Sequence, residues 1–275
     1  MKLKITKIQK VIGGLSRNLN SKFFVSSFEN TDLIKVIKEL KKVPPRDIDF
    51  QKSQLLEGNG VIIKIRDNDD IDNEYKISKL LGRTKGYVKF LHYFSCKDNF
   101  RDFFEGRKDK ICDGEGLMKV IIMPYFPLGS IANYEWNDDT LRSTLYLACL
   151  FYIDAFIEKG FIHNDFHAGN ILLKSTKKNK IDFGDGYIVE TNHIRPWICD
   201  FEKSVIGIDI NNPKLYGDFK YDLQKLFFLL PTFIHNIDKS GCVKISSFIE
   251  NCSNIKEIKE KLKEVIYSFI IIYGL

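Results

Sequence analysis

His163-Asn164-Asp165-Phe166-His167-Ala168-Gly169-Asn170, followed at once by the apolar run Ile171-Leu172-Leu173, is the most informative part of this chain. It holds an acid, four intervening residues and then an amide that directly precedes a short strand. A phosphoryl-transfer site needs an acid that accepts a proton and an amide that holds a cation. The spacing therefore predicts such a site, provided that other parts of the chain supply a lysine, a glutamate partner, a hinge and a second metal-binding acid.

Length and composition predict a folded protein with room for two lobes around one cleft. The chain has 275 residues, of which 44% are hydrophobic and 13% aromatic, so it can bury a sizeable core. The 42 Lys and Arg against 36 Asp and Glu give a net charge of +6. This mild excess suits phosphate ligands but is too small to indicate a nucleic-acid partner.

Targeting features predict an intracellular protein. The N-terminus has no long apolar core of the kind that a secretory signal contains. The apolar C-terminal run 265–273 falls short of the roughly 20 residues that span a bilayer, so we expect a buried terminal helix and no membrane partner. The cysteines are scattered without metal-ligand spacing and are expected to be reduced thiols: Cys96, Cys112, Cys149, Cys199, Cys242 and Cys252.

Residues 1–60 contain the fewest recognisable signals. Asn30-Thr31-Asp32 can cap a short amphipathic helix that ends before Pro44-Pro45. A glycine-rich phosphate loop is expected here, but only Gly13-Gly14 and Gly58-Asn59-Gly60 cluster glycines, and the second cluster fits a hairpin turn better.

A lysine and a glutamate follow at a spacing that allows them to pair. The β-branched run 61–66 predicts a strand with Lys64 among apolar neighbours. Such a lysine either extends outward from an edge strand or points toward an anion in a cleft. Residues 72–81 predict a helix that ends at Gly82, from which Glu74 could reach Lys64. An exposed helix glutamate is the alternative at this position.

The middle of the chain predicts the boundary between two lobes. Residues 87–94 are strand-like, 97–116 form a polar connector, and 117–123 predict a buried strand. The prolines and glycine of 124–130 predict a stiff linker. Beyond it, Asp138-Asp139 is expected to cap a long helix that ends at Gly160.

These features together resemble the protein kinase-like superfamily over roughly residues 55 to 235. His163-x-Asp165-x-x-x-x-Asn170 looks like its catalytic loop, Lys64 and Glu74 look like its lysine–glutamate pair, and Met123-Pro124-Tyr125-Phe126 looks like its gatekeeper and hinge. The resemblance implies an α+β, bilobal fold with a small antiparallel β-sheet and one main helix in the N-lobe and a mostly helical C-lobe. The lobes would be 1–123 and 131–275, joined by a hinge at 124–130, with 1–54 as an unassigned extension with strands.

The resemblance also implies ATP and Mg²⁺ as cofactors and gives each matching residue a role. Asp165 would accept or orient the proton of the attacking hydroxyl, and Asn170 would bind magnesium. Lys64, oriented by Glu74, would bind the phosphates of ATP. Adenine would lie beside Met123 and pair with the carbonyl of Pro124 and the amide of Phe126.

Two acids compete for the role of the second metal ligand. Asp182-Phe183-Gly184 spells the usual triplet of the superfamily, 12 residues after Asn170. Its surroundings, however, predict a solvent-facing hairpin. Asp200-Phe201-Glu202 lacks the glycine and lies 30 residues after Asn170, but it follows the buried run 196–199. Kinase-like proteins of large DNA viruses resemble the second arrangement, so Asp200 is the predicted ligand, with Asp182 as the alternative.

The expected activity is that of an ATP-dependent serine/threonine protein kinase that resembles viral kinases. Residues 220–230 look like the buried helix whose acid, here Asp222, braces the catalytic loop. The resemblance implies a monomer with a protein substrate, in the host cytoplasm or in the virion if the protein is viral. His167 stands where such kinases usually carry lysine, and no Ala-Pro-Glu follows. A small-molecule kinase of the aminoglycoside or choline kinase kind and a nucleotide-binding pseudokinase therefore remain alternatives.

Overall fold

In the computed structural model the chain forms two compact units. The first consists of Met1–Lys79 and Val88–Tyr125, and the second of Leu80–Tyr87 and Phe126–Leu275. The helix expected after Asn30, the turn at 58–60 and the glycine-rich loop lie outside the described residues. The lobe boundaries given above stay a prediction. The structure describes residues 8–12, 22–26, 61–66, 70–98, 116–184, 187–210 and 212–273.

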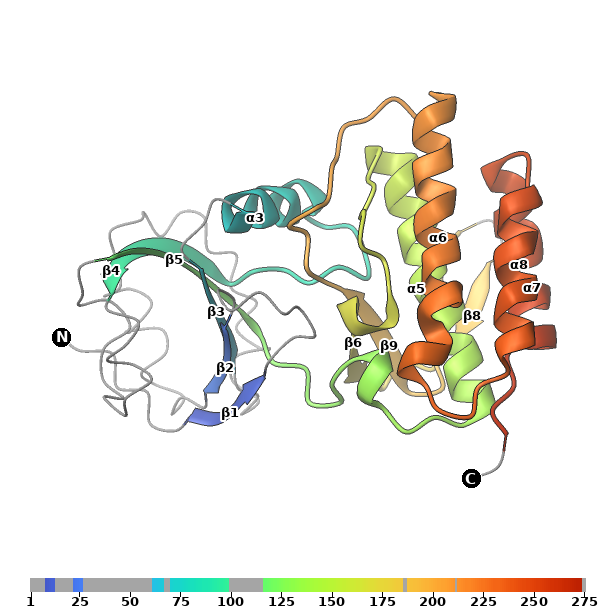
Figure 1. Cartoon of the computed structure of the whole chain (residues 1–275), viewed down its shortest axis with the longest axis horizontal. Helices are drawn as coiled ribbons and strands as arrows, with labels where there is room; N and C mark the ends of the chain where they lie inside the picture. The colour runs from blue at the N-terminus through green and yellow to red at the C-terminus, as the bar shows by residue number, and fades with distance from the viewer. Residues whose placement is uncertain are drawn as a thin grey trace. The chain divides into compact units, whose positions relative to one another are not determined.

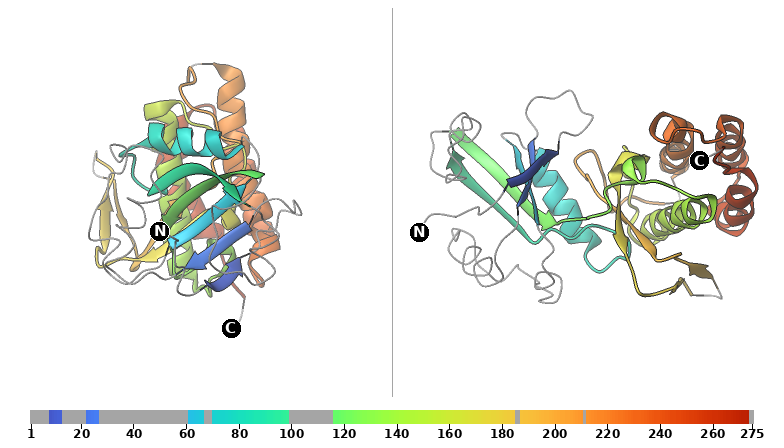
Figure 2. Two further views of the ribbon diagram at one scale, coloured as in Figure 1. Left: turned by 90° about the vertical axis from the view of Figure 1, so that its left-hand side faces the viewer. Right: turned by 90° about the horizontal axis from the view of Figure 1, so that it is seen from below.

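The first unit contains a five-stranded antiparallel sheet with the order β1-β2-β3-β5-β4 (Figures 1 and 2). Lys64 lies in the central strand β3, where it is paired with Phe23 on one side and Ile121 on the other. The strand expected from residue 87 begins only at His92, because Tyr87 belongs to the second unit and bridges to Ile198 there. The strands are β1 (Ile8–Ile12), β2 (Lys22–Ser26), β3 (Val61–Arg66), β4 (His92–Asp98) and β5 (Gly116–Pro124).

Helix α3 (Asp70–Leu81) is attached to this sheet through polar and aromatic contacts. The Asp72 carboxylate accepts a hydrogen bond from Lys119 Nζ at 2.5 Å and another from the Tyr93 hydroxyl. Burial opposes ionisation of Asp72, but these two donors outweigh it and lower the pKa of the carboxyl. The Tyr75 and Tyr93 rings stack with centroids 4.6 Å apart. These contacts hold the first turns of α3, and with them Glu74, against the sheet.

The second unit is mostly helical, with two small antiparallel sheets, β6 with β9 and β7 with β8 (Figure 1). The hairpin predicted around Asp182 is present as β7 and β8. The elements are η2 (Ile131–Asn133), α5 (Asp138–Lys159), η3 (Ala168–Asn170), β6 (Ile171–Ser175), β7 (Lys180–Asp182), β8 (Ile188–Glu190), β9 (Ile194–Ile198), α6 (Pro213–Phe233), α7 (Lys239–Asn251) and α8 (Ile255–Phe269).

Helix α5 forms the centre of the second unit. Its N-cap is Asn137, which accepts a hydrogen bond from the Thr140 amide at 3.0 Å, and not the Asp138-Asp139 pair. The two acids occupy the first turn, where the positive end of the helix dipole favours them. Gly160 ends the helix at φ 57°, as predicted. Among the described residues α5 is the one helix long and apolar enough to cross a membrane, and 78% of its most apolar window is buried, as in a core helix.

Aromatic rings fill the core around α5. The Tyr152 ring lies 4.6 Å from Phe166 and 5.1 Å from Phe219, and Phe219 stacks on Phe156 at 4.2 Å. Each buried aromatic side chain of this kind contributes large apolar area to folding. This cluster joins α5, α6 and the segment 161–166, so the predicted catalytic loop is built on the core of the unit.

Candidate active site

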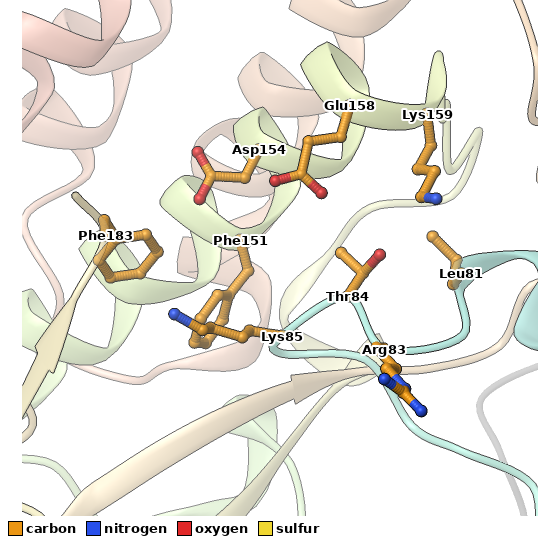
Figure 3. A pocket seen from close by; sticks show the side chains of 9 residues that line it. All are labelled: Leu81, Arg83, Thr84, Lys85, Phe151, Asp154, Glu158, Lys159 and Phe183. Atoms are coloured by element: carbon orange, nitrogen blue, oxygen red, sulfur yellow. The ribbon is translucent and has the colours of Figure 1, made fainter.

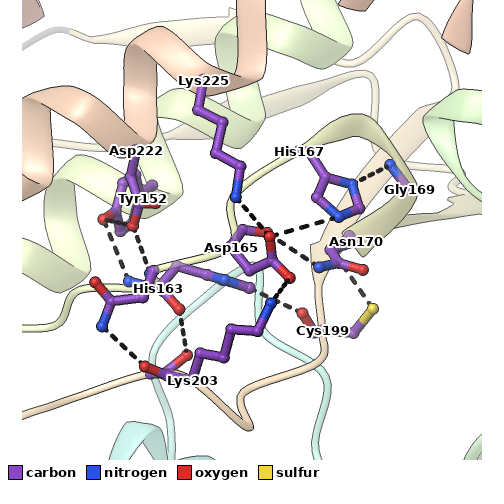
Figure 4. Close-up of polar contacts among 12 residues, drawn as sticks. Tyr152, His163, Asp165, His167, Gly169, Asn170, Cys199, Lys203, Asp222 and Lys225 are labelled. Carbon is purple, nitrogen blue, oxygen red and sulfur yellow. Dashed lines mark hydrogen bonds and ion pairs between the residues drawn. The ribbon is translucent and has the colours of Figure 1, made fainter. Parts of the chain in front are cut away.

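The backbone of the loop 163–170 is fixed by a buried acid on α6. Asp222, a residue that is 1% exposed, accepts hydrogen bonds from the Asn164 amide at 2.6 Å and the Tyr152 hydroxyl at 2.8 Å (Figure 4). Asn164 adopts φ 62°, a left-handed conformation that asparagine tolerates better than most residues. The bracing role predicted for Asp222 thus has a direct structural counterpart.

Replacing Tyr152 by Phe is expected to lower the free energy of unfolding by about 1–3 kcal/mol. The substitution keeps the ring but removes a hydroxyl that donates to Asp222 and accepts from the His163 amide at 3.3 Å. Both partners are buried and would lose a hydrogen bond. Urea unfolding measures the change. Tyr221→Phe, at an exposed ring on α6, is the control and should leave stability within about 0.5 kcal/mol.

His163 connects the loop to the segment that follows β9. Its Nε2 lies 2.9 Å from the Cys199 carbonyl oxygen, so Nε2 must carry the proton in this contact. The backbone carbonyl of His163 accepts a hydrogen bond from the Ser204 hydroxyl at 3.1 Å. The ring also lies about equally close to Phe166 and Phe201, at 5.9 Å and 6.0 Å. The loop is therefore held both by Asp222 of α6 and by the segment that follows β9.

The Asp165 carboxylate is held between two ammonium groups. Lys225 Nζ lies 2.6 Å from Oδ1 and Lys203 Nζ lies 2.8 Å from Oδ2 (Figure 4). Burial opposes ionisation of this carboxyl, which is 20% exposed, but the two lysines outweigh the effect and lower its pKa. Asp165 is consequently a carboxylate at neutral pH and can accept a hydrogen bond or a proton from a hydroxyl group.

His167 contributes no full positive charge next to Asp165. Its Nδ1 accepts a hydrogen bond from the Gly169 amide at 3.1 Å, and its ring stacks on Phe233 with centroids 5.4 Å apart. Burial lowers the pKa of the imidazole, and the nearby Asp165 offsets this only in part. Its Nε2 lies 3.8 Å from Asp165 Oδ1, which is beyond hydrogen-bond distance.

Asn170 and Asp200 lie at neighbouring ends of two paired strands. Strand β6 begins directly after Asn170, and β9 ends two residues before Asp200. The Cys199 amide donates to the Asn170 carbonyl at 3.0 Å, so Asp200 is one residue away from a direct contact. The Asn170 side-chain amide donates to the Asp165 carbonyl at 3.0 Å, which leaves its Oδ1 as the atom that can bind a cation.

The backbone of Asp200 has an uncommon conformation at φ 66°. The buried ring of the next residue, Phe201, fixes this turn, because it packs near Tyr87, Phe161 and His163 at centroid distances of 6.0–6.2 Å. Positive φ at a residue other than glycine persists where the surroundings enforce it, and such sites are often functional.

Asp182 has a different environment. It is exposed at the end of β7, and its Oδ1 accepts a hydrogen bond from the Gly184 amide at 2.8 Å within the hairpin turn. Its carbonyl accepts from Lys85 Nζ at 3.2 Å. No contact of Asp182 with the loop 163–170 occurs among the described residues. Asp200, and not Asp182, is therefore the acid that strand pairing brings next to Asn170.

The remaining predicted site residues are distributed over both units. In the first unit, Lys64 Nζ lies 2.5 Å from Glu74 Oε2, and each of these side chains is 1% exposed. Met123 is buried and Pro124 is half-buried at the end of β5. In the second unit, Phe126 is buried with its ring centroid 6.0 Å from that of Trp197.

A separate cavity of about 310 Å³ lies in the second unit between α5 and the turn after α3 (Figure 3). Its charged lining combines Arg83, Lys85 and Lys159 with Asp154 and Glu158. None of residues 163–170 lines it. The cavity is therefore distinct from the loop that carries Asp165.

Sequence reasoning missed the two lysines that hold Asp165. Lys225 follows Asp222 by three residues in α6, and this spacing places both side chains on one face of a helix. Since Asp222 is predicted to brace the loop, that spacing is a signal for Lys225 as well. Lys203 lies in an irregular segment and has no comparable signal.

Comparison with known proteins identifies the fold. No protein-family model matches the sequence, and no curated protein matches it. Among solved structures, the kinase domain of BubR1 is similar with a TM-score of 0.55 and 13% sequence identity, covering 98% of this chain and 86% of that chain. At this identity the likeness concerns architecture alone. The predicted fold class is confirmed: the chain has an α+β, bilobal fold of the protein kinase-like type.

Proposed function

We propose that the protein is an ATP-dependent phosphotransferase that transfers the γ-phosphoryl group to serine or threonine hydroxyls of a protein substrate. The observation that carries the proposal is the Asp165 carboxylate, held by two lysines in a loop that is braced from the core. Asp165 would accept or orient the proton of the attacking hydroxyl. Asp165, whose pKa is lowered, is ionised at neutral pH, and only the ionised form can accept this proton.

The donor atoms of the site fit a magnesium ion. Mg²⁺ prefers oxygen ligands, and the Asn170 amide and the Asp200 carboxylate supply them from adjacent strand ends. When bound, magnesium would offset the negative charge of the ATP phosphates. Lys64, fixed by Glu74, would bind phosphate oxygens, and Met123, Pro124 and Phe126 would contact adenine. These roles are part of the proposal.

The experiment is a transfer assay with γ-labelled ATP and Mg²⁺, using acidic and basic protein substrates and a panel of small alcohols. Label on serine or threonine of a protein is the expected result. Label on a small alcohol alone would show that the acceptor is a small molecule, as in aminoglycoside or choline kinases, and not a protein. If ATP and Mg²⁺ raise the thermal midpoint but no transfer occurs, the protein is a nucleotide-binding pseudokinase and not an enzyme.

Asp200→Ala is expected to weaken the apparent affinity for Mg²⁺ in this assay by at least about tenfold. Asp182→Ala is the matched control, because it removes an equal charge from an exposed hairpin, and it should leave the Mg²⁺ dependence unchanged. Titration of the transfer rate with MgCl₂ measures both. The reverse ranking of the two variants would assign the metal to Asp182.

The hairpin β7–β8 between Asn170 and Asp200 supports the further proposal of a likeness to kinases of large DNA viruses. A monomer that acts in the cytoplasm of a host cell or in a virion is part of the same proposal.

A further inference from the structure

Helix α6 contacts the candidate catalytic loop at two consecutive residues. Asp222 accepts the Asn164 amide hydrogen at 2.6 Å, and Lys225, one turn later on the same face, donates to the Asp165 carboxylate at 2.6 Å (Figure 4). The first contact fixes the backbone of the loop, and the second fixes the side chain that the backbone carries. Since α6 is a 21-residue helix with a buried face, both anchors stand on a rigid element.

The other groups near the Asp165 carboxylate are less suited to hold it. Lys203 contacts Oδ2 at 2.8 Å, but its side chain is 65% exposed and comes from an irregular segment, so solvent screens the pair. His167 accepts a hydrogen bond from the Gly169 amide through Nδ1, and its Nε2 lies 3.8 Å from Asp165 Oδ1. The Lys225 side chain is 22% exposed, and its ammonium forms the shortest of the three contacts.

We propose that Lys225 is a positioning residue for phosphoryl transfer, which fixes the orientation of the Asp165 carboxylate from outside the loop. The inference rests on the proposed function. According to this proposal, α6 orients the proton acceptor Asp165. His167, which lies in the loop itself, is not expected to carry a full positive charge that could do so. Because Lys225 acts through Asp165, its loss should affect the chemical step and not the binding of nucleotide.

The test compares Lys225→Met with wild type by measuring kcat, KM for ATP and ATP affinity by calorimetry. We expect kcat to fall by about 10²-fold, since a misplaced catalytic group has an effect of this size, while KM and affinity for ATP stay within about twofold. Lys225→Arg keeps a donor at this position and should restore most of kcat. Lys203→Met should have a smaller effect than Lys225→Met.

Two controls separate positioning from a structural role. Lys220→Met removes another lysine from α6, one that donates to the carbonyls of Glu250 and Cys252, and should leave kcat unchanged. Hydrogen exchange of the Asn164 amide should keep its protection in Lys225→Met, because Asp222 still accepts that hydrogen.

Each other outcome overturns a defined part of the inference. Wild-type kcat in Lys225→Met, an equal loss in Lys220→Met, or loss of Asn164 protection would each refute the positioning role. A loss confined to KM for ATP would make Lys225 a nucleotide contact instead. A wild-type protein that transfers no phosphate would refute the proposed function, and with it the role of Lys225 in that reaction.

Discussion

Asp165→Asn is expected to lower the rate of phosphoryl transfer by about 10²–10⁴-fold while the protein stays folded. Asparagine has nearly the same shape but cannot accept a proton, and it removes the negative charge that Lys225 and Lys203 contact at 2.6 Å and 2.8 Å. The backbone carbonyl of residue 165, which accepts from the Asn170 amide, is unchanged. Initial rates at saturating ATP, together with the thermal midpoint, measure the effect.

Asp218→Asn is the matched control for this variant. Asp218 is an exposed acid on α6, so the substitution changes net charge equally without touching the loop. Its rate should equal that of wild type. ATP affinity should be similar in all three proteins, because Asp165 is assigned to the acceptor and not to the nucleotide. A rate in Asp165→Asn within a few-fold of wild type would show that another group accepts the proton.

Several elements that carry predicted site residues could be predicted because local pattern and chain order both point to them. The β-branched run around Lys64 forms β3, the amphipathic segment around Glu74 forms α3, and the two side chains meet at 2.5 Å. Asp222 lies on the apolar helix α6 downstream of the loop, and its bracing role is what the resemblance to the protein kinase-like superfamily implies. In each case a few adjacent residues determine the element, and the element determines where the side chain points.

Contacts that join distant segments could not be predicted in this way. Lys203 and Lys225 lie 38 and 60 residues from the acid that they hold, and no local periodicity encodes where a long side chain ends. The run 87–94 is strand-like in sequence, yet Tyr87 forms a single bridge to Ile198 and donates its hydroxyl to the Phe151 carbonyl at 3.1 Å. Tertiary packing overrides propensity at such positions.

Asp182 and Asp200 were predicted from two different signals, a familiar triplet of residues and a buried preceding strand. Asp182 belongs to the familiar triplet, but β7 alternates exposed and buried side chains, as in a strand with one face in water. Every second residue of β9 is buried, namely Ile194, Pro196 and Ile198, and the strand pairs with β6 directly after Asn170. The apolar run before Asp200 therefore indicated which acid lies next to Asn170 better than the Asp-Phe-Gly triplet did. The metal-binding role of Asp200 stays a prediction.

Lys64→Met is expected to lower the free energy of unfolding of the first unit by about 3–5 kcal/mol and to abolish transfer. The Lys64 and Glu74 side chains are each 1% exposed, and Lys64 Nζ lies 2.5 Å from Glu74 Oε2, so the substitution removes the ammonium group that contacts this buried carboxylate. The protein must then protonate Glu74 or expose it by displacing α3. Native-state hydrogen exchange of the β3 and β5 amides measures the stability of this sheet without interference from the second unit.

The double variant Lys64→Met/Glu74→Leu separates the stability of the pair from its proposed chemistry. Two apolar side chains of similar volume remove both buried charges, so the protection of β3 amides should return to within about 1 kcal/mol of wild type. Transfer should stay absent, because Lys64, the residue proposed to bind the phosphates of ATP, is removed. Recovery of both properties would show that the pair holds α3 on the sheet and that phosphate binding does not depend on Lys64. Failure to recover stability would show that the Lys64–Glu74 contact is needed to pack α3, beyond neutralising a buried charge.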